Sequence, residues 1–188
     1  MKNKIKVFKF ILLMLIFTIS ATSCSGQSGG GGKSLNSAEE LKKYLDSQPA
    51  NGPDKPIKVS MGANAPMLSK IAEAINASGK YVSLNITGNA LTTIPENAFK
   101  NCKTLVGITI PNSVTSIDRW AFQNYNLTSI TFQGTIPSDK FGSKDFQYPY
   151  EFESPFYGDL RDKYLAGGIG TYSTTAPVNK YNSIWTKQ

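Results

Sequence analysis

Few residues in this 188-residue chain are of types that carry out catalysis. The sequence contains no histidine, which excludes Ser-His-Asp and Cys-His arrangements and histidine-ligated zinc. Glu151 and Glu153 lie two residues apart among aromatic side chains, and a glycoside hydrolase uses paired carboxylates of this kind. In an extended segment, however, such residues share one face with their carboxyl groups close together, and no other feature supports catalysis. We therefore predict no enzymatic activity, no cofactor and no metal site.

The position of Cys24 near the start of the chain indicates a lipid anchor. Cys24 follows a run of small residues at 21–23, an apolar stretch at 10–19 and, before that, four lysines. An apolar stretch this short suits a cleaved signal peptide, because crossing a bilayer takes about 20 residues. The sequence around Cys24 resembles a lipobox, in which the cysteine is acylated and becomes the new N-terminus. Cleavage without lipid and a retained membrane helix are the alternatives.

The signal segment accounts for most of the positive charge. The whole chain carries a net charge of +7, but loss of the four lysines in 1–23 leaves 16 basic and 13 acidic residues, a net +3. Because no cluster of Lys and Arg remains, we expect no nucleic-acid partner. With Cys24 acylated, Cys102 is the only thiol left, so we predict no intramolecular disulfide and a buried apolar role for Cys102.

The strongest pattern in the chain is an internal repeat. Ile94-Pro-Glu-Asn-Ala-Phe99 returns as Ile117-Asp-Arg-Trp-Ala-Phe122, a displacement of 23 residues (117 − 94). Two full passes and a decaying third align further apolar positions. A fixed period of this length indicates stacked structural units.

Each repeat unit is predicted to contain a strand and a tight turn. Apolar residues alternate in the way typical of strands with one buried face, at Leu84-x-Ile86, Ile108-x-Ile110 and Ile130-x-Phe132. The spacing of three from Leu91 to Ile94, followed by Ala-Phe, indicates a helical or 3₁₀ turn. We expect equivalent strands to pair in parallel, with Phe99 and Phe122 forming a column between the sheet and the turns.

Residues 105–125 read L-x-x-I-x-I-P-x-x-V-x-x-I-x-x-x-A-F-x-x-C, with Tyr125 in the last place. This pattern resembles the BspA-like bacterial leucine-rich repeat. The segments KYLAGGIGTY (163–172) and IWTKQ (184–188) are similar to the C-terminal part of envelope lipoproteins that carry these repeats. The resemblance covers roughly residues 81–188. It implies a surface-exposed bacterial lipoprotein, and some relatives bind host matrix or other cells.

Both ends of the repeat region are predicted to be caps within the same domain. Residues 35–80 contain a capping box at Ser37–Glu40, a helix, a strand at 57–61 beside 81–87, and a second helix from about Pro66 that Gly79 ends. Residues 141–188 are rich in aromatic side chains. They are predicted to form a short helix before Gly167 and two short strands, at 171–174 and 183–186.

The sequence thus predicts an α/β protein: a short right-handed leucine-rich-repeat solenoid with a parallel sheet and two caps. Its predicted parts are a signal peptide (1–23), lipidated Cys24 with a flexible Gly/Ser tether (24–34), and a single domain (35–188). That domain comprises a helix and strand N-terminal cap (35–80), the repeats (81–140) and an aromatic-rich C-terminal cap (141–188).

Two surfaces are candidates for ligand binding. The first is the solvent-facing side of the predicted sheet, which is small, polar and uncharged; its positions are Ser83, Asn85, Thr87, Gly107, Thr109, Ser129, Thr131 and Gln133. The second is the aromatic segment 146–157, where Tyr148, Tyr150 and Tyr157 are candidates to stack on sugars or anchor a protein. Burial of these rings in the cap core is the alternative, which we favour for the second surface.

These features predict a lipid-anchored binding or adhesion module on the bacterial cell envelope, held in the outer membrane by the lipid on Cys24 and exposed at the surface. Its candidate partners are host matrix, a cell-surface protein or a glycan. The alternative is a periplasm-facing structural or interaction subunit without an adhesive role.

Overall fold

The computed structural model describes residues 32–142 and 154–188. Within these ranges the chain forms a mixed α/β structure with a largely parallel seven-stranded sheet and a second, two-stranded sheet. The elements in chain order are β1 (Lys33–Leu35), α1 (Ala38–Asp46), β2 (Ile57–Gly62), α2 (Ala65–Ser78), β3 (Val82–Thr87), β4 (Thr93–Ile94), β5 (Leu105–Ile110), β6 (Ser116–Ile117), β7 (Ser129–Phe132), the 3₁₀ helix η1 (Ser138–Lys140), α3 (Leu160–Gly167), β8 (Gly170–Ser173) and β9 (Thr186–Lys187).

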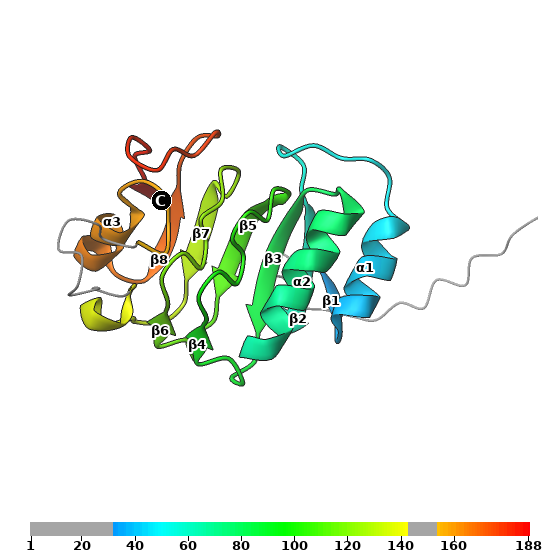
Figure 1. Cartoon of the computed structure of the whole chain (residues 1–188), viewed down its shortest axis with the longest axis horizontal. Helices are drawn as coiled ribbons and strands as arrows, with labels where there is room; N and C mark the ends of the chain where they lie inside the picture. The colour runs from blue at the N-terminus through cyan, green and yellow to red at the C-terminus, as the bar shows by residue number, and fades with distance from the viewer. Residues whose placement is uncertain (1–31, 143–153) are drawn as a thin grey trace, which may run out of the picture.

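The large sheet runs in the order β1-β2-β3-β5-β7-β8-β9. The first five strands are parallel, and β8 and β9 join antiparallel at one edge. The pairing of β2 with β3 confirms the predicted position of 57–61 beside 81–87. Figure 1 shows α1 and α2 together at one end of the sheet and α3 at the other. All three α-helices bury side chains in the same core.

The N-terminal cap follows the local signals in its sequence. The Ser37 side chain accepts a hydrogen bond from the Glu40 amide (3.1 Å), as in a capping box. The Glu40 carboxylate accepts from the Asn36 amide (2.9 Å), one residue before the N-cap amide that a capping box uses. Asn64 caps α2 by accepting from the Met67 amide at 3.2 Å. Gly79 ends α2 with a left-handed φ of 63°. Both predicted helices are confirmed.

One predicted boundary is wrong. Lys33 and Ser34 were expected in the flexible tether 24–34, but they form β1 with Leu35 and pair with Val59 to Met61 of β2. Leu35 is 5% exposed, so burial of this side chain orders the residues just before it. The stretch is too short to show a strand pattern in the sequence.

The predicted turn within each repeat is confirmed around Ala-Phe, where the Ala98 amide donates to the Pro95 carbonyl at 3.2 Å in a 3₁₀-type bond. The residues before it, with the spacing of three, form a short strand instead. Thr93–Ile94 (β4) and Ser116–Ile117 (β6) pair in parallel and form the second sheet. The spacing of three from Leu91 to Ile94 reflects burial of both residues, not helical geometry. β-Branched Thr and Ile favour a strand, and each copy completes its backbone hydrogen bonds on the next, as in the Asp118 amide to Ile94 carbonyl bond of 2.9 Å.

The corner after each of these short strands requires one residue with a left-handed backbone conformation, that is, a positive φ. Asn97 has φ 60°, and Trp120, 23 residues later, has φ 57°. Asparagine adopts this conformation readily, whereas an L-residue with a large side chain pays about 1–2 kcal/mol for it. The repeat geometry therefore imposes a strained backbone on Trp120.

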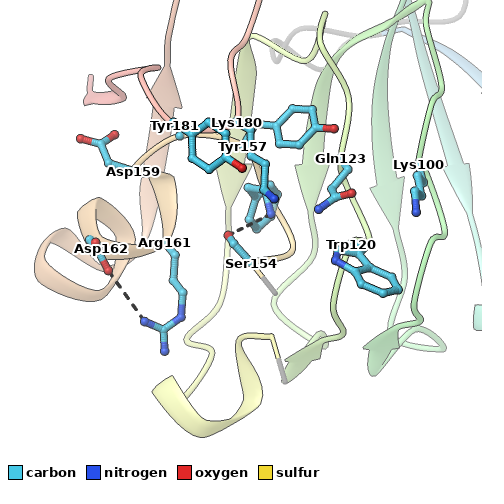
Figure 2. Close-up of a pocket in the computed structure, with 12 residues that line it drawn as sticks. Lys100, Trp120, Gln123, Ser154, Tyr157, Asp159, Arg161, Asp162, Lys180 and Tyr181 are labelled. Carbon is cyan, nitrogen blue, oxygen red and sulfur yellow. Dashed lines mark hydrogen bonds and ion pairs between the residues drawn. The ribbon is translucent and has the colours of Figure 1, made fainter. Parts of the chain in front are cut away.

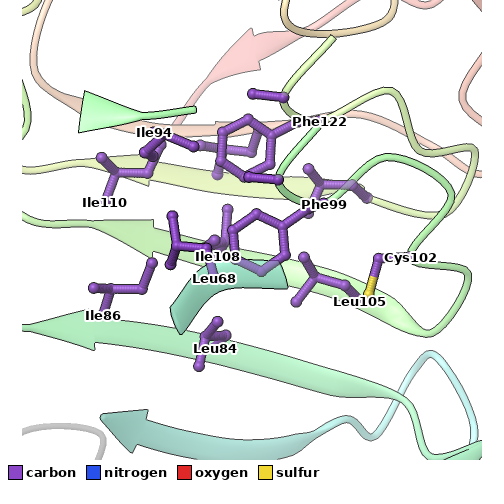
Figure 3. Packing of buried hydrophobic residues seen from close by; sticks show 14 of the residues in the cluster. Leu68, Leu84, Ile86, Ile94, Phe99, Cys102, Leu105, Ile108, Ile110 and Phe122 are labelled. Carbon is purple, nitrogen blue, oxygen red and sulfur yellow. The ribbon is translucent and has the colours of Figure 1, made fainter. Parts of the chain in front are cut away.

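The predicted aromatic column is present and longer than expected. The rings of Phe99 and Phe122 stack with centroids 5.3 Å apart, and Phe156 continues the column 4.9 Å from Phe122. Figure 3 shows Phe99 and Phe122 within the buried cluster. The Phe122 amide donates to the Pro155 carbonyl at 2.8 Å, just as the Phe99 amide donates to Ala121 at 2.7 Å. Phe156 therefore occupies the aromatic position of a third repeat.

This third repeat was predicted to decay, and the prediction is wrong. Phe141 forms a bridge with Ile117 in the two-stranded sheet, and Phe156 forms one with Phe122. The spacing from Phe122 to Phe156 is 34 residues (156 − 122) instead of 23. Because Phe141 pairs with Ile117 at a spacing of 24 (141 − 117), ten of the eleven extra residues fall between Phe141 and Phe156. An insertion of this length hides the third repeat from a search at fixed period.

Asparagine side chains join successive repeats. The Asn124 amide group donates to the carbonyls of Cys102 and Leu105, and its carbonyl accepts from the Asn126 amide at 2.8 Å. Asn124 is 2% exposed, so these bonds satisfy a polar group in the core. Asn76 similarly accepts from the Lys103 amide at 2.8 Å. The apolar pattern gave no indication of these contacts.

The C-terminal cap both covers the last repeat and extends the sheet. The buried aromatic side chains of 141–188 within the described ranges are Phe141, Phe156, Tyr157, Tyr164, Tyr172 and Trp185. The helix ending at Gly167 and the strand near 171–174 are confirmed as α3 and β8. The last strand is Thr186–Lys187 rather than 183–186, because the Ser183 side chain accepts from the Asn179 amide (2.6 Å) in the preceding loop.

The aromatic column makes a direct prediction about stability. Replacement of Phe122 by Ala removes the middle ring of the stack, and we expect it to lower the free energy of unfolding by about 3–5 kcal/mol. Tyr181→Ala is the matched control, since Tyr181 is 78% exposed, and should change it by about 0.5 kcal/mol or less. Guanidinium denaturation followed by circular dichroism measures both. Equal losses in the two variants would contradict the assigned role of the column.

Candidate functional site

One face of the large sheet carries two rows of small polar residues. The first row crosses six strands and consists of Ser34, Ser60, Asn85, Thr109, Thr131 and Thr171. The second row consists of Lys58, Ser83, Gly107, Ser129 and Ser173. Directly paired residues project to the same side, so the two rows form one surface, here called the polar sheet face.

This face is open to solvent. The described helices all bury side chains in the core on the opposite side of the sheet. Thr87 and Gln133, predicted at the rim, are exposed, and the predicted positions in the middle of the face, apart from buried Gly107, are half-buried. The register confirms the predicted columns: Ser83 pairs with Gly107, and Asn85 with Thr109. The structure thus brings together all the sheet residues that the sequence predicted.

The groups on the face are partly engaged with one another. The Asn85 amide donates to the Ser60 hydroxyl at 3.2 Å, and the hydroxyls of Thr131 and Thr171 are 2.9 Å apart. Apart from Lys58, the two rows hold no charged side chain, and they contain no carboxylate or thiol. The face therefore offers a lattice of hydrogen-bond donors and acceptors rather than acid–base chemistry.

Gly107 shapes the centre of the face. A Cβ atom at this position would lie 2.9 Å from the Ser83 hydroxyl oxygen, closer than real side chains approach. The register of β5 shifts between Val82 and Ser83 of its partner, a β-bulge next to this position. Glycine thus allows the close approach and keeps the middle of the surface shallow.

The sequence missed the outer strands of the face. Ser34 lies in β1, which was assigned to the tether, and Thr171 and Ser173 lie in β8 of the cap. For β8, a strand was predicted at 171–174, but only as part of the C-terminal cap. The sequence did not reveal that this strand joins the sheet of the repeats.

The second candidate surface is only partly described. Tyr148 and Tyr150 lie outside the described residues, as do Glu151 and Glu153. Tyr157 is 9% exposed, and its ring lies 5.0 Å from that of Tyr125. Burial, together with neighbouring Tyr125, raises the pKa of Tyr157 to about 12. Its backbone carbonyl accepts from the Trp185 indole at 3.0 Å, so Tyr157 belongs largely to the cap core.

Cys102 has the environment of a structural thiol. It is fully buried, and its sulfur lies 3.6 Å from the Ala72 carbonyl. Burial raises the pKa of the thiol to about 12, so Cys102 stays protonated at neutral pH and is a poor nucleophile. The predicted buried position of this cysteine is confirmed.

The described ranges contain neither a cluster of metal ligands nor a helix that could span a membrane. Within 32–142 and 154–188, His, Cys, Asp and Glu form no group of three or more that could hold a metal ion. No helix in those ranges combines the length and apolar character that a membrane span requires.

Residues 70–154 match the family model for a BspA type leucine rich repeat region (6 copies). This stretch is a BspA-type leucine-rich repeat region. The BspA-type region begins within α2 and contains β3, β5 and β7, the central strands of the polar sheet face. No curated protein and no solved structure matches the chain. The similarity of the tail segments 163–172 and 184–188 to envelope lipoproteins lies outside the match and stays a prediction.

Proposed function

We propose that this protein is a lipid-anchored leucine-rich-repeat solenoid of the bacterial cell envelope that binds protein or glycan ligands through its polar sheet face. The observation that carries the proposal is the open, nearly uncharged face that runs across the BspA-type repeats. Parallel sheets are ordinarily covered on both faces, and the strands are then apolar on both sides. Here one side of every repeat strand is polar, which suits a surface that meets solvent and ligands.

The chemistry of the face favours an extended ligand. Hydroxyl and amide groups provide individually weak hydrogen bonds, and a ligand that spans several strands gains many of them at once. Both the edge of a protein and an oligosaccharide present repeated polar groups on this scale. The shallow centre at Gly107 adds space for close approach.

The anchor is the second part of the proposal. Cys24 precedes Lys33, where β1 begins, by nine positions (33 − 24). A Gly/Ser-rich linker of that length spans on average about 16 Å, so an acylated Cys24 keeps the domain next to its membrane. A ligand is then either on that membrane surface or brought to it from outside.

The binding surface is tested by crowding it with large charged side chains. In a screen of glycans and matrix proteins against the full chain in detergent, we expect the double variant Thr109→Arg/Thr131→Arg to lose the ligands of the native protein. Both residues sit in the middle of the first row. Thr115→Arg, on the exposed turn before β6, is the matched control and should keep them. Retention of every ligand by the double variant would contradict binding through this face.

The anchor and its orientation are tested in cells. We expect a fatty-acid analogue to label the native chain and not the Cys24→Ala variant, because acylation needs the thiol. Labelling of Cys24→Ala would remove Cys24 from this role. Protease added to intact cells should digest the anchored protein. Protection from protease would instead support the periplasm-facing subunit described as the alternative.

A further inference from the structure

A hollow of about 650 Å³ lies between the corners of the repeats and the C-terminal cap. Its walls include Lys100, Trp120 and Gln123 from the repeat corners, and Tyr157, Lys180 and Tyr181 from the cap. Figure 2 shows these side chains around the space, with Trp120 and Gln123 on the turn after β6. The volume falls within the range of small-ligand sites. The corners lie across the core from the polar sheet face, so the two surfaces are separate.

Trp120 is the first residue that indicates a binding site in the hollow. The equivalent corner residue of the previous repeat is Asn97, which suits the left-handed backbone that both positions share. A tryptophan there is strained, and its half-buried ring is not part of the core cluster. The Arg119 guanidinium lies 4.8 Å from the centre of this ring, and the ring forms an aromatic wall of the hollow. Backbone strain kept at a half-buried aromatic residue outside the core is typical of a binding site.

Cations surround the aromatic rings of the hollow. The Lys100 ammonium lies 4.7 Å from the centre of the Trp120 ring, and the Lys180 ammonium lies 5.0 Å from that of Tyr181. Within the described ranges, neither lysine forms an ion pair. Contact with a ring holds an ammonium in place without neutralising its charge.

The acidic residues of the hollow are already occupied. The Asp159 carboxylate accepts from the Trp185 amide at 2.7 Å and lies 3.8 Å from the Lys163 ammonium. Asp162 lies 3.8 Å from the Arg161 guanidinium. Among the described residues that line the hollow, the charge left to attract a ligand is therefore that of Lys100 and Lys180.

We propose that this hollow binds a saccharide that carries a carboxylate group. The lysines would pair with the carboxylate, the Trp120 and Tyr181 rings would contact the apolar edge of the sugar, and Gln123 with Ser154 would meet its hydroxyls. An acidic peptide would satisfy the lysines as well. The polar walls suit it less, because peptides anchor on fully desolvated apolar pockets. This proposal does not depend on ligand binding by the polar sheet face.

Isothermal titration calorimetry on the full chain in detergent tests the proposal. The probes are trigalacturonic acid, a hyaluronan hexasaccharide and 3′-sialyllactose, which separate plant or microbial from host sources. The neutral controls are the methyl esters of trigalacturonate and of the hyaluronan hexasaccharide and, for 3′-sialyllactose, lactose. We expect saturable binding of at least one acidic probe and none of its neutral counterpart. Tryptophan fluorescence gives a second readout, since Trp120 is half-buried and the other tryptophan, Trp185, is 2% exposed.

Three variants locate the binding. Trp120→Asn installs the residue of the previous repeat, so the fold should be kept, with unchanged emission from buried Trp185 as the check. We expect Trp120→Asn and Lys100→Gln each to weaken binding about tenfold. Lys103→Gln, an exposed lysine that does not line the hollow, should leave it unchanged.

Several results would overturn the proposal. These are no saturable binding of any acidic probe, equal binding of the neutral counterpart, and affinity that Trp120→Asn does not alter. Tighter binding of a polyglutamate peptide than of every saccharide would assign the hollow to acidic peptides instead. Because Thr109→Arg/Thr131→Arg leaves the hollow intact, failure here is distinguishable from failure of the sheet-face proposal.

Discussion

Stacking of three phenylalanine rings sets the spacing of the whole repeat region. Phe99, Phe122 and Phe156 lie 5.3 and 4.9 Å apart with interplanar angles of 8° and 4°. Rings that are nearly parallel at this distance require the backbones that carry them to advance by one strand spacing, which is about 4.8 Å. The column and the parallel sheet therefore impose the same step on the chain, and each repeat places its apolar residues where the previous one did.

This constraint separates the positions that must repeat from those that are free. Ala98 and Ala121 are buried at equivalent places, each directly before a stacked phenylalanine in the sequence. Positions outside the core are not bound in this way: Asn97 becomes Trp120, and Lys100 becomes Gln123. Both proposed binding surfaces are built from such positions. The polar sheet face uses the outward side of each strand, and the hollow uses the corners.

The sequence predicted the parts of the fold that repeat or that have local signals. Alternation located β3, β5 and β7, and capping residues located both N-terminal helices. Prediction from the sequence failed where a contact between residues far apart in the chain decides the structure. Thr93–Ile94 is a strand only because Ser116–Ile117 lies beside it, and Lys33–Leu35 only because β2 does. Phe156 was missed as a repeat residue because 34 positions, not 23, separate it from Phe122.

For the site, the columns of the polar sheet face were predicted from the sequence. The hollow was not predicted, since its walls come from segments far apart in the chain.

The central claim is that repeats and caps form one cooperative unit around the aromatic column. Native-state hydrogen exchange measures this directly, through the amides that join successive units: Ile57 to Tyr81, Val82 to Thr104, Phe122 to Pro155 and Thr174 to Thr128. We predict that all four exchange with the free energy of global unfolding. Exchange of the Phe122 and Thr174 amides at a much lower free energy than the other two would show that the C-terminal cap opens by itself, and would contradict the account.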